Sequence, residues 1–128
     1  MARVYSSTSV ATTLATGLAG SSGATTMVVS SGTGAALIQG SGFIDTDIFT
    51  IAIDPDTQNE EICYVIANAG DTFTITRARA GTSVIAHSSG ATVKHVLSSA
   101  DLDYFRDGIQ SGGTSSTSIP DLIMLMGG

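Results

Sequence analysis

Residues 61–77 read EICYVIANAGDTFTITR, and this stretch decides the fold. Two runs rich in β-branched and aromatic residues flank the turn-forming segment Asn68–Asp71, whose glycine can adopt the positive φ of a tight hairpin. In the second run, alternation predicts that Phe73 and Ile75 face inward, and we expect the threonines and Arg77 to face outward. The stretch therefore predicts an antiparallel β-hairpin.

Further β-type runs lie on both sides of this hairpin. The expected strands cover residues 24–30, 48–53, 61–67, 72–77 and 91–96. We expect the sheet core to consist of Phe49, Ile51, Ile53, Val65, Phe73, Ile75, Val93 and Val96. Residues 31–42 contain several glycines and are expected to form a loop. The pattern predicts a mainly β fold, a small antiparallel β-barrel or sandwich with one short C-terminal helix and extended terminal arms.

An ordered motif runs from the end of the hairpin through the loop that follows it. The pattern T-R-x-x-x-G-T-x-x-x-x-H-x-x-G-A-T-V-x-H-V is made by Thr76, Arg77, Gly81, Thr82, His87, Gly90, Ala91, Thr92, Val93, His95 and Val96. With D-P-x-T-x-N-E-E at residues 54–61, it resembles a small β module of tailed-bacteriophage structural proteins, often near the N-terminus of tail-fibre-like chains. The resemblance covers about two fifths of the chain, residues 54–103, and implies a virion structural protein.

The composition of the 128-residue chain limits the classes of partner that it is expected to bind. Charged residues make up 12%, against ~25% in ordinary globular proteins, and such a surface favours residence inside an assembly. The net charge of −6 argues against nucleic-acid binding, which needs clustered cations. No apolar run is long enough for a membrane span and no signal peptide is visible, so we expect a virion protein assembled in the host cytoplasm.

The chain divides into four expected segments. Residues 1–23 are expected to form an extended arm received by a partner, or else a disordered N-terminus, and residues 24–97 the β domain. Residues 98–110 are expected to form a short helix, begun by Ser98 or Ser99 and running from residue 100 to 110. Residues 111–128 combine a flexible linker with an apolar tail.

Two apolar sets are candidates for subunit docking. The helix carries one stripe, Leu102, Phe105 and Ile109, at i, i+3 and i+7. The tail carries the other, which consists of Ile119, Leu122, Ile123, Met124, Leu125 and Met126. Because so apolar a tail would not remain in water, it either returns to its own core or docks on another subunit, and the linker favours docking.

The aspartate residues could bind a metal ion, but their positions are better explained by a role in turns. Two D-x-D pairs, at residues 45–47 and 54–56, invite a calcium interpretation. An EF-hand loop beginning at Asp54 would need Gly at its sixth position and Glu at its twelfth, where the chain has Asn59 and Val65. We therefore expect turn-forming carboxylates.

The histidines and the single cysteine also lack a catalytic or metal context. His87 and His95 have neither zinc-site spacing nor further ligands, and are expected to make structural hydrogen bonds. Cys63 is expected to be a small buried hydrophobe within a strand. No nucleotide-binding glycine motif is present. We expect no metal, no cofactor and no enzymatic activity.

The favoured function is a tail or neck fibre-attachment or adaptor module of a bacteriophage virion. It would assemble with other virion proteins as a homotrimer or ring component. The alternative is a capsid decoration (cement) protein, whose Ser/Thr/Gly arms would lie across neighbouring capsomers. A cell-surface carbohydrate-binding module ranks below both, because an aromatic platform is hard to build without Trp and with only 3 Tyr.

Overall fold

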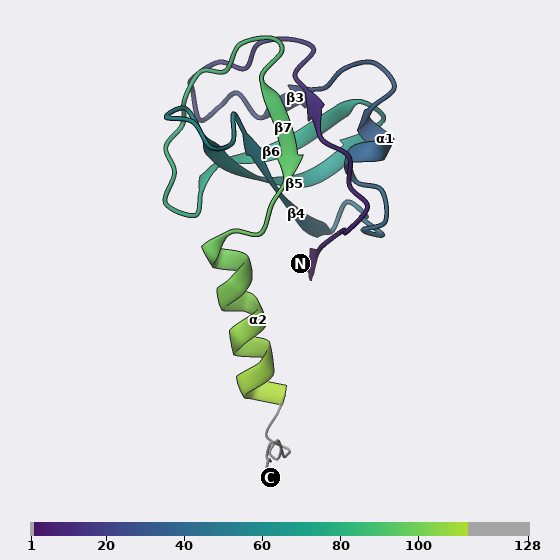
Figure 1. Cartoon of the computed structure of the whole chain (residues 1–128), viewed down its shortest axis with the longest axis vertical. Coiled ribbons are helices and arrows are strands. Elements are labelled where there is room, and N and C mark those ends of the chain that lie inside the picture. Colours follow the sequence, from purple (N-terminus) through teal and green to yellow (C-terminus); the bar gives the residue numbers. More distant parts are fainter. Residues whose placement is uncertain (1, 113–128) are drawn as a thin grey trace. The chain divides into compact units, whose positions relative to one another are not determined.

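The computed structural model describes residues 2–112, and side chains as far as residue 107 (Figure 1). Its strands are β1 (Ala2–Val4), β2 (Thr12–Thr13), β3 (Thr26–Val28), β4 (Asp47–Ile53), β5 (Glu61–Ala69), β6 (Thr72–Arg79) and β7 (Thr92–His95). Its helices are α1 (Gly34–Leu37) and α2 (Ser99–Gly112). The chain divides after Ser98 into two compact units, a β unit and a unit that begins with α2.

The β unit is one curled antiparallel sheet, which confirms the mainly β fold class. Its strand order is β2-β7-β4-β5-β6-β3, and β1 pairs in parallel with β4. The predicted hairpin is β5–β6, with Gly70 at φ 65° in its turn. The strands curve around a common interior (Figure 1), and the inward face of β4 lies opposite that of β5, with Phe49 beside Val65 and Ile51 beside Cys63.

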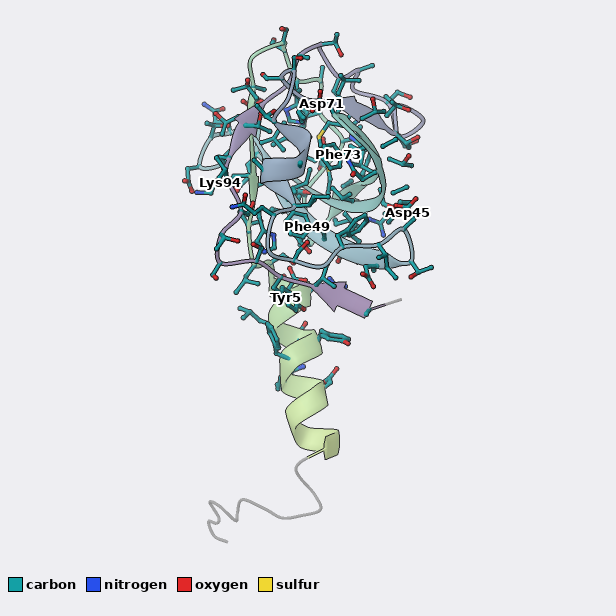
Figure 2. The ribbon with its side chains drawn as sticks, turned by 90° about the vertical axis from the view of Figure 1, so that its right-hand side faces the viewer. Tyr5, Asp45, Phe49, Asp71, Phe73 and Lys94 are labelled. Atoms are coloured by element: carbon teal, nitrogen blue, oxygen red, sulfur yellow. The ribbon has the colours of Figure 1, made fainter. Side chains whose placement is uncertain are left out.

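The core is largely the predicted one. Phe49, Ile51, Ile53, Val65, Phe73, Ile75 and Val93 are all buried, and Figure 2 shows Phe49 and Phe73 inside the β unit. Val96 is the exception: it follows the end of β7 and is only half-buried, so its assignment to the core was wrong. Cys63, expected as a buried hydrophobe, also belongs to the core, and further members that were not in the predicted core set are Leu14, Leu18, Met27, Val29 and Leu37.

The N-terminal residues are part of the sheet, which corrects the expectation of an arm that packs only on a partner. β1 pairs with β4, β2 pairs with β7, and both Leu14 and Leu18 are buried in the core. A bridge between Leu14 and Val29 joins the two ends of the strand order. Two backbone hydrogen bonds flank it, Ala15 N–H to Val28 O and Ser30 N–H to Thr13 O, each 2.9 Å. These contacts close the curled sheet on itself.

A short helix interrupts the glycine-rich segment that was expected to be a loop. α1 places Leu37 in the core, and it packs against the β5–β6 turn. A Cβ on Gly34 would lie 2.2 Å from Gly70 O, so only glycine fits there. The Asp71 carboxylate accepts the Gly32 and Gly34 N–H groups, each at 2.9 Å, and these bonds lower its pKa.

The C-terminal helix was predicted, and α2 extends it by one residue at its start and two at its end. Leu102 and Phe105 are 56% and 42% exposed, and Tyr104 between them is 48% exposed. The side chain of Ile109 and the whole tail, residues 119–128, lie outside the described residues. Within the described residues, no helix is both long and apolar enough to cross a membrane.

Candidate functional site

The motif residues meet in a buried polar cluster, which we call the ion network: Asp54, Glu61, Arg77 and His87. Glu61 begins β5, Arg77 lies near the end of β6, and the other two come from the segments after β4 and β6. Glu61, Arg77 and His87 are buried, with 0%, 4% and 3% of their surface exposed. Four ionisable groups from distant parts of the chain therefore share one site at the edge of the core.

Arg77 faces inward, so its predicted outward orientation was wrong. It has the same alternation as Phe73 and Ile75, and its charge is matched by Glu61 on the neighbouring strand. Nε lies 2.8 Å from Glu61 Oε2 and Nη2 lies 2.9 Å from Oε1, a bidentate ion pair. The hydrogen bonds to Glu61 raise the pKa of Arg77. A cation can be buried here because its partner carboxylate is buried with it.

The remaining Arg77 donors bind backbone carbonyls of two other segments. Nη1 donates to Ala19 O and Ala24 O, each at 2.9 Å, and to Ser21 O at 3.3 Å. Nη2 donates to Ile85 O at 2.8 Å. One guanidinium thus ties the segment before β3 and the loop after β6 to the hairpin, and none of its nitrogens lacks an acceptor.

Glu61 is satisfied as fully as Arg77. Besides the guanidinium, it accepts the Ala78 N–H at 2.9 Å and the Ile85 N–H at 3.2 Å. The left-handed φ of 54° at Ala78 accompanies the first of these contacts. Burial by itself would raise the pKa of Glu61, but the hydrogen bonds from Arg77, His87 and the two amides outweigh it and hold the pKa at about 2. The carboxylate is ionised at neutral pH.

His87 lies between two carboxylates. Its Nδ1 is 2.8 Å from Asp54 Oδ2, and its Nε2 is 2.9 Å from Glu61 Oε1. An ionised carboxylate only accepts, so both contacts are satisfied together when both ring nitrogens carry hydrogen. Its backbone exchanges two 2.8 Å hydrogen bonds with Leu18. The prediction of a structural hydrogen-bonding histidine is confirmed, although the sequence did not indicate either carboxylate partner.

Cys63 lies next to the ion network, and its thiol has a raised pKa. It is fully buried, and its Sγ lies 3.6 Å from Glu61 Oε2. Burial, together with the nearby Glu61 charge, raises its thiol pKa to about 12. Because the nucleophilic form of cysteine is the thiolate, this site does not favour nucleophilic chemistry. The expectation of a small buried hydrophobe at this position is confirmed.

The other motif positions also have structural roles. The Thr82 hydroxyl accepts the Ile62 N–H at 3.0 Å and donates to Arg79 O at 2.7 Å, which closes the turn after β6. Gly81 and Gly90 have φ of 81° and 89°, values that favour glycine. The T-R-x-x-x-G-T-x-x-x-x-H pattern therefore holds a loop and two strands together.

The Asp pairs act as turn and cap residues in the structure. Asp47 Oδ2 accepts the Ile44 N–H and Asp45 Oδ1 accepts the Asn68 N–H, each at 3.1 Å. Asp54 and Asp56 have positive φ in the turn after β4. Among the described residues, no group of three or more His, Cys, Asp or Glu side chains is arranged to hold a metal ion.

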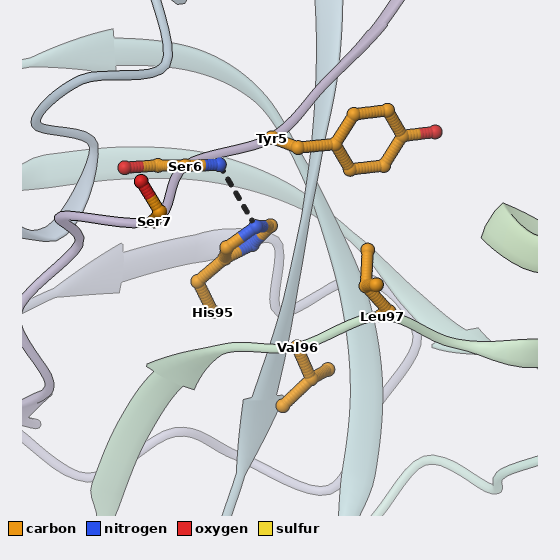
Figure 3. Close-up of a pocket in the computed structure, with 6 residues that line it drawn as sticks. All are labelled: Tyr5, Ser6, Ser7, His95, Val96 and Leu97. Carbon is orange, nitrogen blue, oxygen red and sulfur yellow. Dashed lines mark hydrogen bonds between the residues drawn. The ribbon is translucent and has the colours of Figure 1, made fainter.

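His95 lies apart from the ion network, beside a surface pocket of about 450 Å³ (Figure 3). Its ring stacks on Phe49 at 4.1 Å between centroids, Nδ1 donates to Thr50 O at 2.7 Å, and Nε2 accepts the Ser6 N–H at 3.3 Å. The pocket is lined by Tyr5, Ser6, Ser7, His95, Val96 and Leu97. His95 thus fixes the segment after β1 against β7, which is again a structural role.

No protein-family model matches the chain, and a search of curated proteins finds no match. Of the predicted docking residues, the structure describes the side chains of Leu102 and Phe105, which are exposed on α2.

Proposed function

We propose that the chain is a bacteriophage virion structural protein, a tail or neck fibre-attachment or adaptor module that acts by protein–protein assembly. The observation that carries this proposal is a β unit whose buried ion network is satisfied internally, followed by a helix with exposed apolar side chains. An enzyme needs reactive groups that a substrate can reach, whereas here the strongest cluster of such groups is buried and fully paired. An assembly module instead needs a stable unit and an apolar contact surface.

The motif geometry supports the same proposal. Glu61, Arg77, Thr82 and His87 are among the residues of the phage-module pattern that bond to one another or to the strands of the β unit. The pattern therefore describes how a small β module is held together, so that its reuse in different assemblies requires no shared ligand. This is the behaviour expected of a structural module in fibre-like chains.

Assembly is proposed to run through α2 and the apolar tail. Leu102 and Phe105 lie three residues apart, on one face of the helix, where an exposed apolar pair favours a second helix. A homotrimer or ring with other virion proteins as partners would cover this face. The cement-protein alternative is less favoured, because the β1 and β2 strands within residues 2–23 pair inside the β unit.

Light scattering on the purified full chain tests the assembly surface. We expect the native chain to be an oligomer and the double variant Leu102→Ser, Phe105→Ser to be a monomer with an unchanged β signal in circular dichroism. The matched control is Ile44→Ser, which removes an apolar side chain that is 62% exposed in the β unit and should leave the oligomer intact. A monomeric native chain, or an oligomer that survives the double variant, contradicts the assembly surface.

The location is tested on particles. Antibodies against the chain should label purified virions at the tail or neck, and its gene should lie among genes for tail, neck or head proteins. Labelling of the capsid shell would favour the cement protein, and absence from purified particles would refute a virion role.

A further inference from the structure

A second pocket, of about 280 Å³, lies on the β unit where β5 bulges between Val65 and Ala67. It is lined by Ser22, Thr25, Ile66, Thr74, Ile75, Thr76, Arg77 and Arg79. Thr74 and Thr76 alternate with the buried Phe73 and Ile75, so they belong to the outward face of β6. Because the volume is just below the roughly 300–1,000 Å³ of drug-sized sites, it suits a ligand of about one sugar ring.

The hydroxyl groups of this pocket are not used by the protein. Ser22, Thr25, Thr74 and Thr76 make no side-chain hydrogen bond to another group of the described residues. Elsewhere in the β unit, hydroxyls pair closely with one another, as Thr12 does with Thr33 at 2.6 Å. The pocket therefore gathers four hydroxyls that can each donate and accept toward a ligand.

Arg79 supplies a fixed cation at the same pocket. Its Nε donates to Arg77 O at 3.0 Å, and it lies between Ala78 and Ala80, whose φ values are 54° and 52°. Left-handed backbone at non-glycine residues is strained, and such strain clusters at functional sites. Its Nη1 and Nη2 have no hydrogen-bond partner among the described residues, although the ring of Tyr64 lies 6.0 Å from the guanidinium carbon. The guanidinium is therefore fixed through its Nε, while Nη1 and Nη2 can bind a ligand.

The charge of the pocket lining and the pairing of β6 limit the class of ligand that the pocket can bind. None of the lining residues is acidic, although the chain as a whole carries a net charge of −6, so the pocket is locally positive. A single guanidinium fork matches one carboxylate in a bidentate pair. β3 pairs with β6 over Thr72–Thr74, and Thr25 O accepts the Ile75 N–H, so a peptide cannot be added as an edge strand along this part of β6.

We propose that this pocket binds a carboxylate-bearing sugar unit of the hexuronic acid class. The carboxylate pairs with Nη1 and Nη2 of Arg79, and the ring hydroxyls bond to Thr25, Thr74, Thr76 and Ser22. Recognition rests on charge and hydroxyl groups, so it does not need the tryptophan platform that the chain lacks. The site is independent of α2, and its test does not depend on the state of assembly.

The test is an NMR titration of the ¹⁵N-labelled full chain with D-glucuronic acid, with D-glucose and acetate as matched probes. Saturable shifts are expected for the Arg79 Nε–H and for the amides of Thr25, Thr74 and Thr76 with glucuronate alone. Arg79→Gln should weaken binding roughly tenfold or more, because a charge-assisted bidentate contact is lost. Lys94→Gln, which removes another cation from the β unit, should bind like the native chain.

Three results would overturn the proposal. The first is the absence of saturable shifts with glucuronate. The second is equal shifts with glucose or with acetate, which would remove the carboxylate or the sugar from the recognised group. The third is unchanged binding by both Arg79→Gln and Thr74→Val, two exposed positions whose variants are checked for native melting before titration.

Discussion

Replacing the buried Arg77 by Met should destabilise the β unit more than the replacement of any exposed charged residue of that unit. The substitution keeps an apolar chain of similar length but removes the bidentate pair to Glu61 at 2.8 and 2.9 Å. It also removes the donors to Ala19 O, Ala24 O and Ile85 O. Breaking a buried ion pair by removing one partner costs about 3–5 kcal/mol, because the other charge is left buried without compensation.

That loss is large against the total stability of a small domain, about 5–15 kcal/mol. The measurement is urea denaturation followed by circular dichroism at pH 7. With a urea m-value of about 1.5 kcal/mol/M, the midpoint should fall by about 2–3 M. Arg79→Met is the matched control on the same strand, and its exposed side chain should change the free energy of unfolding by about 0.5 kcal/mol or less.

Adding Glu61→Gln to the Arg77→Met variant should restore part of the lost stability. The neutral amide removes the unpaired buried charge, so the effects of the two changes should not add. The reasoning is refuted if Arg77→Met costs less than about 1 kcal/mol, or if the Arg79→Met control costs as much.

Four further outcomes are expected. The folded-state pKa of Glu61, about 2, lies below its ordinary 4.5, so its contribution is complete above pH 4.5 and is lost as the pH falls toward 2; urea titrations should show about 3 kcal/mol lost over that range, and a flat profile would contradict the network. Phe73→Ala should cost roughly 3–5 kcal/mol because the ring is fully buried, and an unchanged thermal melt would remove the hairpin from the core. Dialysis against a chelator should leave the melting temperature and the oligomeric state unchanged, whereas a fall in either would reveal a metal. Deleting the residues after Ser118 should leave the β unit folded by circular dichroism and abolish assembly by light scattering, and unfolding would show that the tail belongs to its own core.

The hairpin and most of the core were predictable because their signals are local. β5 and β6 alternate around a glycine turn, and the inward residues of β4 are visibly larger than the outward ones. The N-terminal strands were not predictable for the opposite reason. β2 has two residues and no periodicity, and it is fixed by its pairing with β7, about eighty positions away in the sequence, and by hydrogen bonds to Ser30 and Thr33. Pairings of that range leave no trace in a local pattern.

Only part of the ion network was predicted from the sequence. His87 was expected to make structural hydrogen bonds, but Arg77 was expected to face outward, whereas it is buried. A signal was present: Arg77 shares its alternation with Phe73 and Ile75, and Glu61 shares that of Cys63 and Val65 on the adjacent strand. A cation and an anion on the inward faces of paired strands predict a buried pair, whereas the carbonyls that complete the site follow only from the tertiary fold.

The N-terminal segment closes the β unit, and this limits which parts of the chain can bind a partner. Residues 2–23 provide two strands, two core leucines and two of the carbonyl acceptors of Arg77, Ala19 O and Ser21 O. If a partner pulled this segment away, the sheet would lose its closing bridge and the guanidinium would lose acceptors that nothing else in the unit replaces. Exchange of the N-terminal segment between subunits is therefore costly, whereas α2 belongs to a separate compact unit. We infer that assembly proceeds from the C-terminal side of Ser98, with the β unit presented intact.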